Sequence, residues 1–364
     1  MKKIIWIPLV ILIIGICIAL AGFANGGMKS LWLDRAGFHI EDGSQGNLIT
    51  VDETYDSFKN IEIKADYIER IEIKEGNSFS VRGQNYEHLG SLIVSKNGDT
   101  VRVDSKSDDK LIFSIGVEEV FNKNDTWIEI TYPAGSNLGL VDTDLSAGSI
   151  TISNINCDDL NVDNDFGKTD LSTVQANKLT VVANAGDVNL SNIIVTGNVT
   201  IDNDFGDVDL ANVRANSLTT ILNSGRLKTS DIFADRISLK NDFGKIEVDG
   251  IEATELKMDL NSGDLDADNV SSKNLSIESD FGKIDIDRLT FTGECDVENN
   301  SGSINLNLLM NKDDISYELE ADAGSVTVDG QTTSKGAVSS RAARGTTKLE
   351  ASTDFGGISV NFLG

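Results

Sequence analysis

The sequence has few of the residues that a disulfide scaffold or a catalytic centre needs. Its 364 residues include only three Cys, two His and two Pro. Cys17, Cys157 and Cys295 are too few and too scattered to form a disulfide framework. His39 and His88, the two histidines, lie outside the repeated part of the chain described below. The composition therefore offers little support for cysteine or histidine chemistry.

Positive charge is also scarce. The chain has 31 Lys and Arg against 58 Asp and Glu, a formal net charge of -27, and no local basic cluster reverses that sign. Such a chain repels nucleic-acid phosphate and anionic lipid, so nucleic-acid binding is not expected. What the chain has instead is 33 Gly, and many Asn, Asp, Ser and Thr among Val, Ile and Leu. This mixture is typical of short strands separated by turns, and it predicts an all-β fold.

The one long apolar run lies near the N-terminus. Residues 4–24, IIWIPLVILIIGICIALAGFA, are long enough to cross a bilayer as a helix. Because Lys2 and Lys3 precede the run, the positive-inside rule predicts a cytoplasmic tail at residues 1–3 and an extracytoplasmic remainder. A cleavable signal peptide is the alternative, since Ala19-Leu20-Ala21 is an acceptable cleavage site. Both readings place the bulk of the chain outside the cytoplasm, either anchored in the cell membrane by a single pass or secreted.

A glycine recurs along the C-terminal half with differences of 19 or 20 residues. The series is Gly148, Gly167, Gly186, Gly206, Gly225, Gly244, Gly263, Gly282 and Gly302. It continues less strictly to Gly324 and resumes at Gly356 after an interruption. Fixed periods of this kind are the sequence signature of a repeat architecture.

Each repeat carries apolar residues two, four, seven, twelve and fourteen positions after its glycine. In the unit that begins at Gly244 these are Ile246, Val248, Ile251, Leu256 and Met258. Alternation of this kind predicts short extended stretches with one face buried. A single unit cannot bury these side chains, but stacked coils share a core. The sequence therefore predicts a β-solenoid with 19–20 residues per coil.

The repeats alternate in kind, so the full period is two coils. Asp-Phe-Gly ends at every second glycine, and Asn-Ser-Gly or a related tripeptide ends at the others. Two residues before Phe243 the chain has Asn241, whereas the neighbouring coils have Leu222 and Leu260 at that position. We expect each recurring glycine to form a corner of the coil, and Phe and Leu to interdigitate across it. The Asn or Asp two residues before nearly every glycine is expected to stack as a polar ladder.

Residues 25–50 have no period and are expected to form a linker. Residues 51–135 contain less regular strands that are expected to cap the solenoid, and residues 136–364 form the solenoid with an irregular C-terminal end. The order from the membrane segment through FKNIEIKADYIERIEIKEGNSFSVRG to repeated NSGDL and DFGKI coils resembles the bacterial putative-adhesin family, a group of surface β-solenoids of unknown function. The resemblance covers roughly residues 51–364. It implies an envelope-facing, non-enzymatic protein and transfers no catalytic or binding residues.

The residues allow three chemical hypotheses. A kinase Asp-Phe-Gly motif lacks every accompanying motif here, and its fivefold recurrence indicates turn chemistry. Lys168, Lys245 and Lys283, which follow the tripeptide, are expected to pair with neighbouring acids. A polysaccharide lyase or glycosidase needs a paired acid and base in a cleft, and the regular coils carry almost no insertions to build one.

A calcium-binding surface solenoid is the third reading, although the GGxGxD core of calcium-binding repeats is absent. The aspartates that could place oxygens along the rod are Asp163, Asp165, Asp204, Asp242, Asp264, Asp266, Asp268, Asp285 and Asp287.

The sequence therefore predicts a membrane-anchored extracytoplasmic protein that is not an enzyme and acts in adhesion, envelope binding or sensing. It assigns no catalytic, cofactor-binding or metal-ligating residue and no cofactor. The expected partners are the membrane, through the single N-terminal span, and a cell-wall polymer or an envelope protein. No nucleic acid or small-molecule substrate is expected. The alternatives kept open are the polysaccharide-active enzyme and the calcium-binding solenoid.

Overall fold

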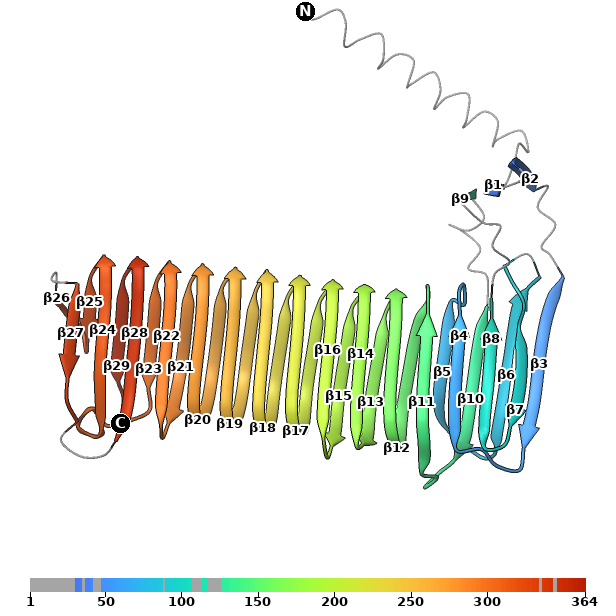
Figure 1. Cartoon of the computed structure of the whole chain (residues 1–364), viewed down its shortest axis with the longest axis horizontal. Helices are drawn as coiled ribbons and strands as arrows, with labels where there is room; N and C mark the ends of the chain where they lie inside the picture. The colour runs from blue at the N-terminus through green and yellow to red at the C-terminus, as the bar shows by residue number, and fades with distance from the viewer. Residues whose placement is uncertain are drawn as a thin grey trace, which may run out of the picture.

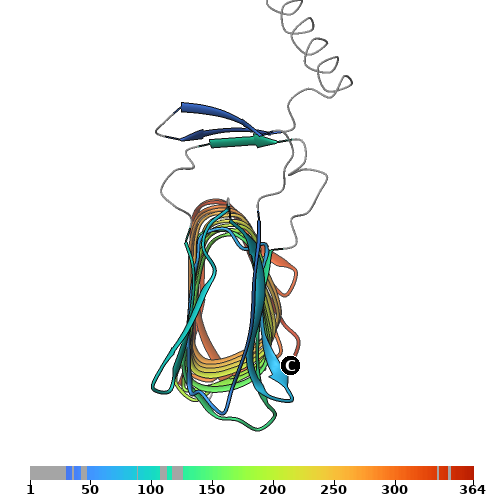
Figure 2. The ribbon, with the colours of Figure 1, turned by 90° about the vertical axis from the view of Figure 1, so that its right-hand side faces the viewer.

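A computed structural model describes residues 30–34, 37–41, 47–87, 89–106, 113–116, 126–333, 336–342 and 346–364. Within these ranges the chain is an all-β solenoid, a straight rod whose coils are flattened in cross-section (Figures 1 and 2). None of the described segments forms a helix long and apolar enough to cross a membrane. The predicted membrane segment, residues 4–24, lies outside the described residues.

The regular coils stack their strands in parallel and in register, so that equivalent positions of successive repeats lie side by side; Leu239, for example, is paired with Met258. These strands are β11 (Leu138–Leu145), β12 (Ser149–Phe166), β13 (Thr169–Ala176), β14 (Lys178–Ala185), β15 (Val188–Val195), β16 (Asn198–Phe205), β17 (Val208–Ser224), β18 (Leu227–Phe243), β19 (Ile246–Ser262), β20 (Leu265–Phe281), β21 (Ile284–Phe291), β22 (Glu294–Ser301) and β23 (Ile304–Leu308).

The core fills the inside of the flattened coils. In the coil after Gly244, the side chains of Ile246, Val248, Ile251, Leu256 and Met258 are all buried. Burying one such side chain contributes about 1.5–3 kcal/mol, and every coil repeats the contribution. The inward positions expected from the alternation are thus confirmed.

The coils that begin at Gly148 to Gly282 also contain a second turn, which the glycine series did not predict. The residue six positions after each recurring glycine from Gly148 to Gly282 has a left-handed backbone, with φ between 52° and 57° in Asn154, Thr173, Asn192, Asn212, Asp231, Asn269 and Arg288, and 88° in Gly250. Asn, Asp and Gly tolerate this conformation better than other residues do, and they occupy most of these positions. The recurrence of Asn, Asp and Gly at this position of the repeat could have predicted the turn from the sequence.

The N-terminal end is built from β3 (Leu48–Tyr55), β4 (Asn60–Ala65), β5 (Arg70–Gly76), β6 (Phe79–Tyr86), β7 (Ile93–Asn97), β8 (Thr100–Ser105) and β10 (Trp127–Pro133). The coil formed by β4 and β5 lies between later segments, because β4 pairs with β8 and β11 and β5 pairs with β10 and β12. Antiparallel pairings of β3 with β6 and of β7 with β8 finish this end. Such pairings use strand edges that would otherwise recruit another chain.

The C-terminal end contains the 3-10 helix η1 (Lys312–Asp314) and strands β24 (Ile315–Ala323), β25 (Val326–Val328), β26 (Gln331–Thr333), β27 (Ala337–Ser340), β28 (Thr347–Phe355) and β29 (Ile358–Phe362). Here the order in space differs from the order in sequence. β28 pairs with β22 on one side and β24 on the other, and β29 likewise lies between β23 and β25. The coil that contains Gly356 is therefore inserted between those of Gly302 and Gly324, which accounts for the interrupted glycine series.

A separate antiparallel sheet consists of β1 (Ser30–Asp34), β2 (Gly37–Glu41) and β9 (Phe113–Gly116). It draws its strands from two segments of the chain that are distant in sequence.

Candidate binding surface

The corner glycines bring successive coils into close backbone contact. Gly244 has φ 139°, and a Cβ atom there would lie 1.9 Å from the carbonyl oxygen of Gly225 in the preceding coil. Both the backbone conformation and the space therefore require glycine. Because successive glycines stack this closely, the residues just before each glycine also lie beside their equivalents in the neighbouring coils.

Buried asparagines satisfy the backbone at four of the corners. The Nδ2 group of Asn241 donates to the carbonyl oxygen of Gly225 at 2.9 Å and to that of Lys245 at 3.4 Å. Asn164, Asn203 and Asn299 make the equivalent bond to Gly148, Gly186 and Gly282. In the intervening coils Leu222 and Leu260 fill the same buried position. From Asn203 to Leu260, Asn and Leu thus alternate at one buried position of the core.

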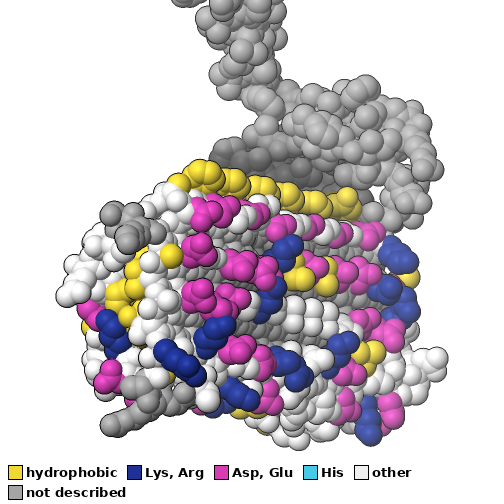
Figure 3. Space-filling model, turned by 60° about the vertical axis from the view of Figure 1, so that its left-hand side comes forward, with side chains coloured by type: hydrophobic (Ala, Val, Ile, Leu, Met, Phe, Trp, Pro, Cys, Tyr) yellow, Lys and Arg dark blue, Asp and Glu magenta, His cyan; other side chains and the backbone are white. Residues whose placement is uncertain are grey.

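The phenylalanines of the Asp-Phe-Gly corners point outward, so the prediction that they interdigitate with Leu222 and Leu260 is wrong. Phe166, Phe205, Phe243, Phe281 and Phe355 have 59–67% of their surface exposed. The strand ends at the corner, because the glycine there has a positive φ and turns the chain. Strand alternation therefore no longer indicates whether the phenylalanine before that glycine faces inward or outward. Figure 3 shows a continuous hydrophobic row along this edge of the rod.

These five phenylalanines alternate with small residues in strict register. Phe243, for example, is paired with Ser224 of one neighbouring coil and Ser262 of the other. The full row is Phe166, Ala185, Phe205, Ser224, Phe243, Ser262, Phe281, Ser301, Phe355 and Ala323. We call it the phenylalanine ridge. With about 4.8 Å between coils, its rings are spaced by about 9.6 Å.

A polar column runs beside the ridge, as expected for the residues two positions before the glycines. From Asp165 to Asp354 it alternates Asp at the phenylalanine coils with Asn at the coils between them, and Asp322 follows beside Ala323. Asn300 donates to Asp280 at 2.7 Å, and Asn184 and Asn223 donate in the same way to Asp165 and Asp204. The neutral amides separate the carboxylates and hold them in place.

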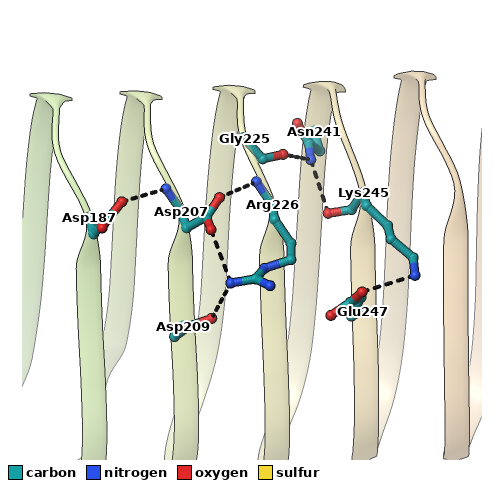
Figure 4. A network of polar contacts seen from close by, with 8 residues as sticks. All are labelled: Asp187, Asp207, Asp209, Gly225, Arg226, Asn241, Lys245 and Glu247. Carbon is teal, nitrogen blue, oxygen red and sulfur yellow. Dashed lines mark hydrogen bonds and ion pairs between the residues drawn. The ribbon is translucent and has the colours of Figure 1, made fainter.

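Charged ladders cover the strands that follow the corner. The backbone amide of Arg226 donates to Asp207 at 2.9 Å, and its guanidinium donates to the same carboxylate at 3.0 Å and lies 4.0 Å from Asp209 (Figure 4). Asp187 accepts from the amide of Asp207 at 3.1 Å. These contacts link three successive coils, although each exposed ion pair adds little stability.

The predicted pairing of the lysines that follow Asp-Phe-Gly is confirmed. Lys168 lies 2.9 Å from Asp170, and Lys283 pairs with Asp285. Lys245 lies 2.9 Å from Glu247 (Figure 4). It also lies 2.5 Å from Asp266, and the hydrogen bonds to Asp266 and, to a smaller extent, to Glu247 raise the pKa of Lys245. These lysines therefore act as coil-edge charges.

An open groove on this face has an acidic lining, and Figure 3 shows the acidic and basic side chains in rows below the hydrophobic edge. The lining residues are Lys228, Thr229, Lys245, Glu247, Val248, Asp249, Asp266, Ala267, Asp268, Asp285 and Asp287. Several of the candidate calcium ligands lie here. They already have partners, since Asp266 binds Lys245 and Asp268 binds Arg288.

Within the described ranges, no three His, Cys, Asp or Glu side chains are grouped so that they could hold a metal ion. The candidate aspartates are instead distributed over several coils. Asp163 lies opposite Asp144 of the neighbouring coil, and burial together with this and other nearby aspartates raises its pKa.

Two of the three cysteines lie in the described coils. Cys157 and Cys295 are both free and buried. Burial raises the pKa of the Cys157 thiol to about 12 and raises that of Cys295 as well. Both are protonated at neutral pH and act as small core residues.

Comparison with protein families identifies the chain. A family model described as Toastrack DUF4097 matches residues 58–227 and again 196–361. The chain belongs to this Toastrack family. The function of this family is unknown. The predicted resemblance to putative adhesins of unknown function is confirmed. No curated protein matches the chain.

Solved structures with a related chain include a putative adhesin from Bacteroides fragilis, 13% identical, which covers 86% of this chain and 97% of its own with a TM-score of 0.33. A putative lipid binding protein from Parabacteroides distasonis is 13% identical and covers 88% of this chain and 98% of its own, with a TM-score of 0.35. A putative adhesin from Parabacteroides merdae is 14% identical and covers 69% and 96%, with a TM-score of 0.27. Structural similarity at these TM-scores does not indicate a function.

Proposed function

We propose that this Toastrack protein is a non-enzymatic surface adhesin, held at the outer face of the cell membrane by residues 4–24, whose solenoid presents a binding surface to partners outside the cell. The apolar run and the two lysines before it support the anchor and its orientation. The regular coils support a scaffold role, because they carry repeated outward-facing rows in place of a deep cleft.

The observation that carries this proposal is the phenylalanine ridge. Five large apolar side chains, each more than half exposed, stand in one line on a chain with a net charge of -27. Folding does not require them, since Ser224, Ser262 and Ser301 occupy the same corner position in neighbouring coils. A contiguous exposed apolar patch that folding does not require is typical of an interaction site.

Protease treatment of intact cells tests the predicted placement. With an epitope tag after Gly364, we expect the protease to remove the tag from intact cells carrying the full chain. Retention of the tag until the cells are lysed would contradict the extracytoplasmic placement.

An attachment assay tests the role of the ridge. Cells carrying Phe205→Ser, Phe243→Ser and Phe281→Ser together should lose most of the attachment that the unmodified chain confers. A matched control replaces Val182, Ile194 and Leu309, which are exposed apolar residues off the ridge, with Ser. Equal attachment by the two variants would refute a ridge-based adhesin.

An enzymatic assay tests the absence of catalysis. The purified full-length protein should produce no new reducing ends or unsaturated products from cell-wall and plant polysaccharides, with or without calcium. Product formation would replace the adhesin proposal with the polysaccharide-active enzyme.

A further inference from the structure

The phenylalanine ridge has a pattern that is complementary to itself. Its large and small residues alternate at every coil, and the alternation extends to the coil before Phe166, where Ala147 precedes Gly148. The amide of Gly148 donates to the carbonyl of Phe166, just as the amide of Gly167 donates to that of Ala185. The ten consecutive positions from Ala147 to Phe355 are therefore five small residues and five phenylalanines, and Ala323 lies one coil beyond them.

We propose that the ridge is a homodimer interface on which a second copy of this chain docks in the antiparallel direction. A two-fold axis perpendicular to the rod, between the coils of Ser224 and Phe243, sets each phenylalanine against a small residue of the other copy. Phe243 then faces Ser224, Phe205 faces Ser262, and Phe355 faces Ala147. A two-fold interface pairs the same patch from both copies, so the patch must be complementary to itself. In this row every phenylalanine ring fills the space above a small residue of the other copy.

The polar column beside the ridge supports the same register. The axis brings the columns of the two copies face to face, so that Asp165 meets Asn300, Asp204 meets Asn261 and Asp242 meets Asn223. At the end of the row, Asp354 meets Ser146. Each carboxylate in this register faces a neutral hydrogen-bond donor. A shift by two coils would instead set Asp165 against Asp322, where two like charges oppose one another.

The apolar area is sufficient for a dimer. At about 60% exposure and roughly 200 Å² per ring, the five phenylalanines offer roughly 600 Å² per copy. The adjoining Asp, Asn and Ser rows bring this toward the roughly 800 Å² per partner of a standard interface. Because each copy has a net charge of -27, repulsion opposes the pairing, and added salt should strengthen it.

The antiparallel arrangement places the N-terminal ends of the two rods at opposite ends of the pair. In combination with the proposed anchor, this geometry suits contact between copies on two facing cells. Homophilic adhesion thus rests on the proposed function, whereas the dimer does not.

Cysteine cross-linking of the full-length protein tests the register. In a Cys17→Ser background, one preparation carries Asp165→Cys and a second carries Asn300→Cys. We expect a disulfide-linked dimer from the mixture and none from either preparation alone, because identical positions would lie seven coils, about 34 Å, apart. Linking within each single preparation would indicate a parallel pair, and no linking in the mixture would contradict the interface; either result overturns the proposal.

Sedimentation of the full-length protein in detergent micelles tests the energetics. Replacing Phe205 and Phe243 with Ser should weaken the dimer by about ten-fold or more for each ring removed, while Ile194→Ser leaves it unchanged. Raising the salt concentration should strengthen the dimer. A dimer that weakens with salt, or that tolerates both ridge substitutions, would overturn the proposal.

A mixed-cell assay separates the dimer from the broader adhesin role. If cells with the protein aggregate with one another and ignore cells without it, the second copy is the partner. If they attach equally to cells without it, or bind glycan or zwitterionic lipid vesicles through the ridge while the cross-link fails, the adhesin role survives and the dimer does not. If the cross-link forms but the cells attach to nothing, the dimer proposal stands and the adhesin proposal is refuted.

Discussion

Ser301 lies directly beside Phe355 on the neighbouring coil, although the whole of β24 to β27 separates them in sequence. The pairing arises because the last strands of the chain, β28 and β29, return into the stack and lie between coils formed earlier. The chain end is thus held on both sides, and the coil exposed at the tip belongs to an earlier segment.

Hydrogen exchange should show this inserted end directly. We expect the amides of residues 347–355 to exchange as slowly as those of β20 (Leu265–Phe281), because both strands have parallel partners on each side. The hairpin strands β26 and β27 provide the matched control and should exchange faster, since each pairs with only one described strand. Rapid exchange at residues 347–355, as expected of a frayed terminus, would contradict the insertion.

The sequence allowed the coil length, the corner glycines and the inward positions to be predicted, because these depend on local periodicity. Ile246 and Val248 follow Gly244 at the two-residue spacing of a strand, and this local pattern is enough to predict that both side chains face the core. The order of the terminal coils depends on which strands pair at long range, and both orders have the same local pattern. The direction of Phe243 was mispredicted because alternation fails at the corner, where the glycine turns the chain.

Gly244→Ala should be severely destabilising. The added Cβ would meet the Gly225 carbonyl oxygen of the packed neighbouring coil, in a backbone conformation that alanine rarely adopts. We expect a loss of about 3 kcal/mol or more in the free energy of unfolding, measured by denaturant titration. The matched control is Gly250→Asn, where the nearest atom is 3.5 Å away and Asn occupies the equivalent turn in other coils. Equal losses for the two variants would show that packing between the glycines is not the cause.

Asn241→Leu tests the role of the buried asparagines. The substitution removes the donor that serves the carbonyl oxygens of Gly225 and Lys245, and it sets a third leucine between Leu222 and Leu260. We expect the free energy of unfolding to fall by about 1–3 kcal/mol. Asn261→Leu, at an exposed position, should change it by less than about 0.5 kcal/mol. An unchanged stability for Asn241→Leu would mean that the asparagine is a tolerated exception in an apolar row.

Asp163→Asn should stabilise the protein at neutral pH. Burial and the neighbouring Asp144 and Asp165 raise the pKa of Asp163, so the folded state holds a proton more tightly than the unfolded chain. The resulting contribution to stability is complete at low pH and is lost as the pH rises through the raised pKa. Asn removes the repulsion that remains above that pKa.

We therefore expect Asp163→Asn to raise the free energy of unfolding by a few tenths of a kcal/mol at pH 7, since the site is mostly exposed and solvent screens it. The gain should vanish as the pH falls below the ordinary aspartate range, where the native side chain is also neutral. Asp202→Asn is the matched control, because Val182 and Ile221 lie opposite it on the neighbouring coils. Denaturant titrations at a series of pH values measure the difference, and a gain that persists unchanged at low pH would assign the effect to packing instead of charge.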